Sequence, residues 1–298
     1  MSEVAESTIE SPPSRLRVAV AQTNGRSDPR DPELLRRSGA EIRELIKRAH
    51  TGRARLAHFP EGALSSPDKR VMSSDPDRVA DADWSAVDWD TYRAELRSIA
   101  QLAAKLGIWV ALPAMHELSG GHRPHNSLYV INDRGNVETR YDERFMSQTK
   151  VTYMYTPGRE PITFVVDGLR IGCTLGIEAV HSESFTDYER RGADLVLFST
   201  TGGPTPASNP TPFFRTTSVY AEVNDYWISL AQTVPGVSAI FGPGGAEPAT
   251  CVERPEPAVA FADVLSSPNA PWRERLRSGI YEEHQVADDA RSLQRTSF

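Results

Sequence analysis

The sequence predicts an α/β protein in which two sheets pack together with helices on their outer sides. Short apolar runs alternate with amphipathic helical segments in one part of the chain, and hairpins join such runs in another. With 298 residues, of which 39% are hydrophobic, the chain can bury a large core. We therefore predict one main domain over residues 16–266, preceded by a disordered leader (1–15) and followed by a C-terminal extension (267–298).

The first half of the chain alternates strand and helix patterns. Pro32 suits the first turn of a helix, and Gly107 ends a second amphipathic run. The first-half elements predicted in order are a strand at 16–22, a helix at 31–50, a strand at 54–59 that ends at Pro60-Glu61, a loop at 62–90, a helix at 91–106, a strand at 108–113 and a hairpin that joins 126–131 to 137–141.

The central stretch, residues 162–199, contains a sharp strand-to-helix transition. Asp167-Gly168 separates two apolar runs as a hairpin turn does, and Ser182 and Gly192 mark the two ends of a helix. The later elements predicted in order are a strand at 194–199, a loop at 200–212, a helix at 213–224 and strands at 227–232, 238–241 and 258–264. An α/β enzyme places its nucleophile at such a transition, because backbone N–H groups converge there. Here the transition carries Gly176, Glu178, His181 and Glu183, and no nucleophile.

Composition excludes several classes of function. A net charge of −7 and a pI near 5.6, without basic clusters, argue against binding to nucleic acid or to an anionic membrane surface. The sequence contains no apolar run of membrane-spanning length and no signal-peptide core. Two cysteines cannot form a disulfide framework, so a cytoplasmic location is expected.

Three motifs occur in an order that resembles the carbon–nitrogen hydrolase superfamily, which includes nitrilases and aliphatic amidases. These motifs are His58-Phe-Pro-Glu61, Tyr141-Asp-Glu-Arg-Phe-Met146 and the segment 172–183, which contains Leu-Gly-Ile-Glu178. The resemblance covers about residues 17–264. It implies a four-layer αββα sandwich, commonly dimeric, in which a glutamate acts as general base, a lysine stabilises the tetrahedral intermediate and a cysteine attacks the carbon atom.

Only one of these three catalytic positions is matched by residue type. Glu61 matches the general base, whereas the lysine position is Glu143 and the cysteine position is Gly176. Glycine has no side chain with which to attack a substrate. Of the four lysines, only Lys150 is a plausible substitute for the missing lysine. Arg144, next to the lysine position, is a weaker candidate because a guanidinium is not equivalent to an ammonium.

The two cysteines are expected to be structural. Cys173 lies three positions before Gly176 on a strand, so its side chain should face the opposite side. Cys251 lies in a late segment that the family does not use for catalysis. Both are therefore predicted to be packed thiols and not nucleophiles.

The carboxylates leave alternatives open. Glu143 either points to solvent or shares a pocket with Glu61, and in a pocket one carboxylate should have a raised pKa or a cation should lie between the two. Glu178, His181 and Glu183 resemble a possible metal cluster, but their spacing is not a known ligand pattern. A packed His181 and a Glu183 that stabilises the helix start are therefore favoured.

Three hypotheses for function follow. The first is a catalytically silent homologue that binds a small molecule or a partner. The second is a repurposed enzyme that uses Glu61 and Glu143 as acid and base on a small nitrogen-containing substrate. The third is an active amidase or nitrilase whose nucleophile is misassigned. No metal or cofactor is expected. The expected ligand is a small nitrogen-containing molecule, and a cationic one would suit a pocket with two carboxylates. We expect a homodimer through the helices near Ser182 and Phe213, whose aromatic residues exceed what one core-facing stripe needs.

Overall fold

The computed structural model describes residues 13–67, 71–75, 77–201, 213–251, 256–266, 279–286, 288 and 290. Most of the predicted leader and nearly all of the loop predicted at 200–212 lie outside the described residues. By its internal contacts the chain divides into one unit that ends at Ser266 and a second that begins at Ser267. Within the second unit the structure describes one short helix, α6 (Ile280–Glu283).

The main unit contains two six-stranded sheets. The first sheet has the strand order β12 (Ala258–Leu265), β1 (Arg15–Gln22), β2 (Leu56–His58), β3 (Trp109–His116), β4 (His125–Ile131) and β5 (Val137–Asp142). The second has the order β11 (Ala249–Thr250), β10 (Ala239–Phe241), β9 (Trp227–Gln232), β8 (Leu195–Thr200), β7 (Leu169–Leu175) and β6 (Thr163–Val166). The parallel strands β1, β2 and β3 of the first sheet, and β7, β8 and β9 of the second, form the centres.

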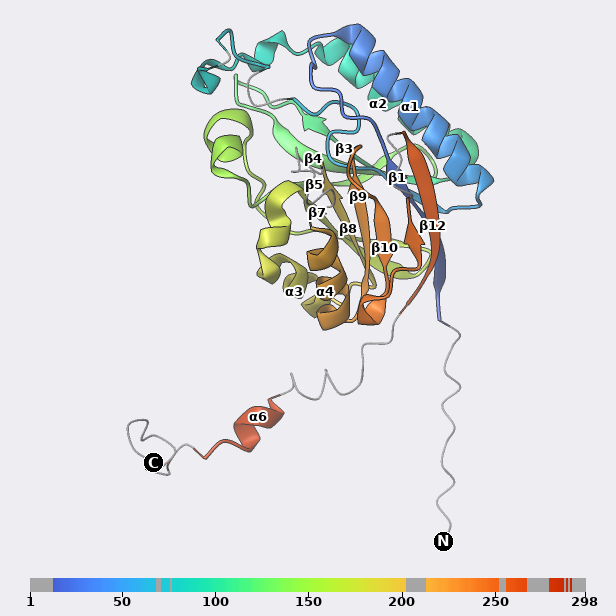
Figure 1. Cartoon of the computed structure of the whole chain (residues 1–298), viewed down its shortest axis with the longest axis vertical. Helices are drawn as coiled ribbons and strands as arrows, with labels where there is room; N and C mark the ends of the chain where they lie inside the picture. Colours follow the sequence, from blue (N-terminus) through green and yellow to red (C-terminus); the bar gives the residue numbers. More distant parts are fainter. Residues whose placement is uncertain are drawn as a thin grey trace. The chain divides into compact units, whose positions relative to one another are not determined.

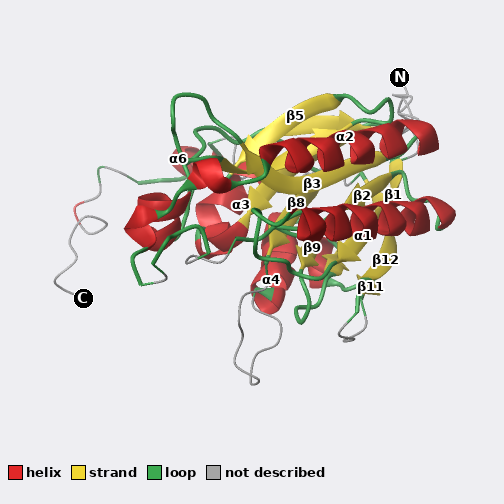
Figure 2. Cartoon of the chain, turned by 90° about the horizontal axis from the view of Figure 1, so that it is seen from above, coloured by secondary structure: helices red, strands yellow, loops and turns green. Residues whose placement is uncertain are grey.

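Helices cover the outer face of each sheet (Figures 1 and 2). The helices α1 (Pro32–Thr51) and α2 (Trp89–Leu106) pack on the first sheet, and α3 (Ser182–Arg190) and α4 (Phe214–Asn224) pack on the second. A third apolar cluster, to which both sheets contribute, fills the space between them. The four-layer αββα sandwich is therefore confirmed.

The local signals that predicted these elements act as expected. Asp31 caps α1 by accepting hydrogen bonds from the backbone N–H groups of Glu33 and Leu34. Gly107 ends α2 in the left-handed conformation, with φ +65°. Asp167 and Gly168 both have positive φ in the β6–β7 turn, as a two-residue hairpin with matching twist requires.

Three local features differ from the prediction. The strand β3 continues past Pro113 to His116. Proline has no N–H group, but Pro113 lies beyond the last β3 residue that pairs with β2, so no hydrogen bond to that strand is lost. A π-helical turn at Lys150–Met154 was not predicted, because one such turn leaves no periodic pattern in the sequence. The helix α3 begins at Ser182 as expected, but without a side-chain cap, since a short 3-10 turn over Gly176–Val180 leads directly into it.

A buried histidine joins the two sheets where β2 ends. His58 Nδ1 lies 2.9 Å from Ser229 Oγ on β9, and Nε2 lies 2.7 Å from Ser199 Oγ on β8. Complete burial lowers the pKa of His58 to about 3, so the imidazole is neutral near pH 7. This link fixes the end of β2, and the residues that follow it, against the second sheet.

None of the described helices combines the length and the apolar character needed to cross a membrane.

Candidate functional site

Three separate segments bring Glu61, Glu143 and Lys150 together at one end of the sandwich. Glu61 follows β2, Glu143 follows β5, and Lys150 opens the π-helical turn. Lys150 Nζ lies 2.5 Å from Glu61 Oε1 and 3.0 and 3.1 Å from the two oxygens of Glu143. The ammonium group thus lies between the two carboxylates. A cation in this position was one of the two arrangements expected if the carboxylates shared a pocket.

Asn126, at the start of β4, orders both carboxylates. Its Nδ2 donates to Glu61 Oε1 at 2.8 Å and to Glu143 Oε2 at 2.6 Å, while its backbone carbonyl accepts the backbone N–H of Glu143. The other oxygen of Glu61 accepts the N–H of Thr201, just after β8. Each carboxylate is therefore fixed by several donors, and Glu143 is fully buried. The alternative in which Glu143 points to solvent is wrong.

Gly176 lies beside this cluster, at the end of β7. Its φ of +60° belongs to the left-handed region, which side chains other than glycine rarely adopt. A Cβ atom added to Gly176 would lie 2.3 Å from Glu143 Oε1 and 2.8 Å from Lys150 Nζ. The charged pair fills the volume into which a side chain at position 176 would project.

Burial and charge act in opposite directions on this cluster. Burial raises the pKa of Glu143 to about 7; Lys150 opposes the rise, whereas the nearby Glu61 charge adds to it. Burial alone would lower the pKa of Lys150, but the two carboxylates raise that pKa well above its ordinary value. Lys150 therefore stays charged, while Glu143 can exchange a proton near neutral pH.

Glu178 stabilises the loop that carries Glu143. It is fully buried, and its carboxylate accepts hydrogen bonds from the Tyr141 hydroxyl and from the backbone N–H groups of Arg144, Phe145 and Leu175. Through these bonds it joins the end of β7 to the segment after β5. Burial still raises the pKa of Glu178 above its usual range.

The other predicted binding residues lie outside the charged cluster. Arg144 Nε donates to the Tyr141 hydroxyl, and its guanidinium lies over the Tyr141 and Phe145 rings, so Arg144 does not replace the lysine. His181 is half-buried against the Phe145 ring, and Glu183 is exposed, 3.6 Å from His181 Nδ1. Across the residues that the structure describes, no group of three or more His, Cys, Asp or Glu side chains is arranged to hold a metal ion.

Both cysteines are buried free thiols. Cys173 lies in the apolar layer between the sheets, where burial raises its pKa well above the ordinary value. Burial also raises the pKa of Cys251 to about 12, and its Sγ faces the carbonyl of Val20. Neither thiol lines the cavity beside Glu61.

That cavity has a volume of about 580 Å³. Glu61 and Lys150 form part of its wall, together with Met154 and Tyr155 from the end of the π-helical turn and Arg26 from the loop after β1. Glu143 is not among the lining residues, so a bound molecule would meet Glu61 and Lys150 first.

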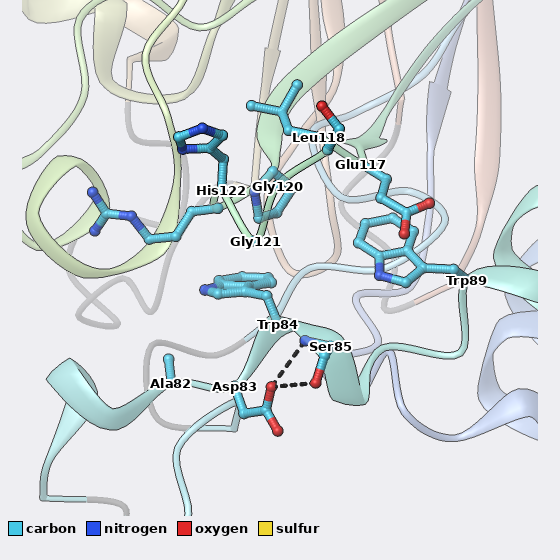
Figure 3. Close-up of a pocket in the computed structure, with 13 residues that line it drawn as sticks. Ala82, Asp83, Trp84, Ser85, Trp89, Glu117, Leu118, Gly120, Gly121 and His122 are labelled. Carbon is cyan, nitrogen blue, oxygen red and sulfur yellow. Dashed lines mark hydrogen bonds between the residues drawn. The ribbon is translucent and has the colours of Figure 1, made fainter.

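A second cavity of about 560 Å³ lies nearby, between Trp84 and the Gly120-Gly121 turn (Figure 3). Trp89 lies on one side of it and His122 on the other. The Trp84 ring packs against Tyr155 with a centroid distance of 5.4 Å. This aromatic contact therefore joins the walls of the two cavities.

Two residues of the site were not singled out from the sequence. Asn126 was recognised only as the start of a hairpin strand, although its position opposite the Tyr141–Glu143 segment in that hairpin could have indicated a contact with the carboxylate. Thr201 followed a predicted strand and gave no signal of its own.

Comparison with known proteins identifies the family. The sequence model of carbon–nitrogen hydrolases matches residues 17–267, which is most of the chain. This chain belongs to the carbon–nitrogen hydrolase family. The match spans both sheets and all three segments of the charged cluster.

Structures of nitrilase-superfamily proteins share this family member's fold. An amidase from Nesterenkonia sp. AN1 superposes with a TM-score of 0.69 at 18% identity, covering 94% of this chain and 100% of the amidase. The NitFhit protein of C. elegans superposes with a TM-score of 0.70 at 20% identity, covering 93% of this chain and 66% of NitFhit. Hydrolase Rv0480c of Mycobacterium tuberculosis is 26% identical over 202 residues, and the match spans 63% of that protein's length.

Proposed function

We propose that this chain is a non-catalytic carbon–nitrogen hydrolase homologue that binds a small nitrogen-containing molecule in the cavity beside Glu61 and Lys150. One observation carries the proposal: the Glu143 carboxylate lies 2.3 Å from where a Cβ atom of residue 176 would be. The position that resembles the family's nucleophile therefore has no side chain, and one placed there would have to displace the Glu143 carboxylate.

The state of the lysine supports the same proposal. Oxyanion stabilisation requires a donor aimed at the charge that develops in the transition state. Lys150 instead directs its ammonium at three carboxylate oxygens of Glu61 and Glu143. A carboxylate beside a developing oxyanion would raise the barrier that the lysine should lower.

Thiol chemistry separates this proposal from ordinary amidase activity. In a glutamate-to-glutamine variant of the Nesterenkonia amidase, the acetamide moiety of fluoroacetamide adds covalently to the active-site cysteine. In this chain, both cysteines are buried and their pKa values are raised, which disfavours the thiolate. We expect no adduct at either cysteine after incubation with fluoroacetamide.

The decisive experiment is mass spectrometry of four forms of the protein: wild type, Gly176→Cys, Glu143→Lys and the double variant. Each is incubated with simple amides and nitriles as well as fluoroacetamide. We expect no acyl adduct on the wild type or on Gly176→Cys, because a missing oxyanion stabiliser alone costs about 10²–10³ in rate. Acylation of the wild type, abolished by iodoacetamide, would contradict the proposal. Acylation of Gly176→Cys as readily as of the double variant would contradict the assignment of Glu143 to the lysine position.

A second candidate function is a repurposed enzyme that uses Glu143 and Glu61 as acid and base. The pKa of Glu143, raised to about 7, supports it, because general acid–base catalysis is most efficient with a pKa near the working pH. The M. tuberculosis relative bears the name hydrolase. Under this alternative, ammonia release from a panel of amides, nitriles and N-carbamoyl compounds would persist after iodoacetamide treatment and would disappear in Glu143→Gln.

We also propose a homodimer in a cytoplasmic, reducing environment. Two of the five aromatic residues expected to form the interface do not support it, because Phe185 and Tyr188 are fully buried in the chain's own core. The other three, Phe213, Phe214 and Tyr220, are partly exposed. The exposed apolar residues on α4 are instead Val219 and Val223, each about half exposed. Light scattering of the wild type should give a dimer mass, and Val219→Asp should reduce that mass. A monomer at micromolar concentration would contradict this proposal.

A further inference from the structure

A separate cavity of about 700 Å³ lies beside β5, at the edge of the first sheet. Its walls come from His125 at the start of β4, from Arg140 and Asp142 on β5, and from the loop that precedes β6. Among the described residues, it shares no lining residue with the cavity beside Glu61. A molecule bound here would therefore occupy a second site.

The loop that closes this cavity is held by the chain itself. The backbone N–H of Thr156 donates to the carbonyl of Pro124, and the N–H of Gly158 donates to the carbonyl of Glu143. A Cβ atom on Gly158 would lie 2.3 Å from the carbonyl oxygen of Asp142, so glycine lets the loop lie directly against the end of β5. The wall of the cavity therefore forms without a ligand.

His125 brings an unprotonated nitrogen to this cavity. Its Nδ1 lies 2.6 Å from the carbonyl oxygen of Thr156, which can only accept, so Nδ1 carries the proton of the neutral imidazole. The lone pair is then on Nε2, which makes no hydrogen bond with any of the described residues. Asp142 Oδ2 lies 3.9 Å from Nε2, and this separation is too long for a hydrogen bond.

Asp142 supplies a second acceptor at the same place. Its Oδ1 accepts from Ser127 Oγ and Arg140 Nε, and its Oδ2 accepts from Arg140 Nη2. Burial acts to raise the pKa of Asp142, but the hydrogen bonds from Arg140 and Ser127 outweigh burial and lower it, so the carboxylate is ionised near pH 7. The side chains of His125 and Asp142 are 15% and 18% exposed, which leaves both within reach of a molecule in the cavity.

The cavity offers charges of both signs. Asp142 and Glu160 are the acidic residues among its described lining, and Arg140 and Arg159 are the basic ones. Arg140 is paired with Asp142, whereas Arg159 is exposed and makes no hydrogen bond or ion pair with another described residue. Equal numbers of acidic and basic groups suit a ligand that carries both signs and no net charge.

We infer that this cavity binds a small zwitterionic amino acid, whose ammonium group lies between His125 Nε2 and Asp142 Oδ2 and whose carboxylate binds Arg159. An ammonium has three N–H donors and can serve both acceptors, because a nitrogen about 2.9 Å from each fits their separation of 3.9 Å. A guanidinium binds a carboxylate through paired, charge-assisted hydrogen bonds. The inference goes beyond the proposed function, since it concerns a different cavity.

Isothermal titration with glycine, L-leucine and 4-aminobutyrate tests this inference. The three probes differ in the distance between their charged groups and in their apolar part. Each is compared with its N-acetyl derivative, which lacks the ammonium, and with its amide, which lacks the carboxylate. At least one probe should bind the wild type, and both of its derivatives should bind about ten-fold more weakly or worse. Thermal shifts should follow the same order.

Three variants assign the two ends of the ligand. Arg159→Gln should raise the Kd of the bound probe about ten-fold and abolish its advantage over the amide. His125→Asn keeps a donor for the Thr156 carbonyl but lacks Nε2, so the Kd should rise about ten-fold while the advantage over the amide remains. Arg134→Gln, which replaces an exposed arginine in the β4–β5 turn, is the control and should leave the Kd unchanged.

Several results would overturn the inference. If none of the three probes binds, the two acceptors hold no more than a water molecule or a proton. Equal binding of a probe and its N-acetyl derivative, or an equal loss for a probe and its amide in Arg159→Gln, would also contradict it. Binding that is lost in Glu61→Gln and unchanged in Arg159→Gln would place the probe in the other cavity. Because Arg159 is exposed, its replacement tests the inference even if His125→Asn does not fold.

Discussion

The carboxylate of Glu143 occupies the space in which a side chain of residue 176 would begin, because a Cβ atom on Gly176 would lie 2.3 Å from Glu143 Oε1. The left-handed backbone of Gly176 adds a second restriction, with φ +60°. Steric and conformational effects therefore coincide at one position, and substitutions can separate them.

Gly176→Ala should destabilise the protein more than Gly107→Ala. Both glycines have left-handed φ, but a Cβ on Gly107 would meet nothing within 4 Å. We expect a loss of about 1 kcal/mol for Gly107→Ala and about 1–3 kcal/mol more for Gly176→Ala, measured by urea unfolding. In a Glu143→Ala background the extra loss at position 176 should become smaller, and what remains should reflect the contact with Lys150 Nζ. Equal losses at the two glycines would show that Glu143 does not fill this space.

Glu143 should make the stability of the wild type fall as the pH rises from about 4.5 to about 7. The folded-state pKa is raised to about 7 from 4.5, so the folded protein binds more protons than the unfolded chain in this window. Stability is fully present below the unfolded value and is lost as the pH passes through the folded one. The free energy of unfolding of Glu143→Gln should lack this loss, which amounts to at most about 3 kcal/mol. A pH-independent difference between the two proteins would contradict the raised pKa.

Lys150→Met should be strongly destabilising. The substitution leaves the Glu61 and Glu143 carboxylates close together without the cation that now lies between them. Breaking a buried ion pair in this way costs about 3–5 kcal/mol, and the loss should be smaller in a Glu143→Gln background. Lys47→Met, which removes the exposed Lys47–Glu44 pair, is the control and should change the free energy of unfolding by less than about 0.5 kcal/mol. Similar changes in the free energy of unfolding for Lys150→Met and Lys47→Met would show that Lys150 stabilises the fold no more than an exposed lysine does.

Glu178→Gln and Glu183→Gln should have very different effects. Glu178 accepts hydrogen bonds from Tyr141, Arg144, Phe145 and Leu175, whereas Glu183 is exposed. Replacing one acceptor oxygen of Glu178 by an amide should cost about 2–4 kcal/mol and increase hydrogen exchange at the N–H groups of Arg144 and Phe145. Glu183→Gln should change neither measurement. Unaltered exchange in Glu178→Gln would mean that the loop after β5 is held by other contacts.

The sequence predicted the layers of the fold because most elements carry strong local signals. Asp31, Gly107 and the Asp167-Gly168 turn mark element ends through backbone chemistry, and hydrophobic spacing marks the buried faces. Motif order was sufficient to propose that Glu61, Glu143 and Gly176 converge, although they are distant in sequence.

The charged cluster was predicted less completely. Lys150 was considered as a substitute for the missing lysine, but its contacts depend on a single π-helical turn that no sequence period indicates. The side-chain contacts of Asn126 and Thr201 depend on how β4 and β8 meet the end of β2, which is a property of the packed sandwich. Arg144 was a reasonable alternative by position, yet the neighbouring Tyr141 and Phe145 rings hold its guanidinium elsewhere.

The left-handed Gly176 and the carboxylate beside it also constrain the order in which this protein could change over generations. A cysteine at position 176 would have to displace the Glu143 carboxylate and adopt a left-handed backbone, so its first expected effect is on stability and not on reactivity. A productive path has to begin at position 143, with a smaller or a basic residue that clears the space. The two positions therefore form an ordered pair of steps, and a chain that carries glycine and glutamate here has a barrier against gaining a thiol at position 176 by a single mutation.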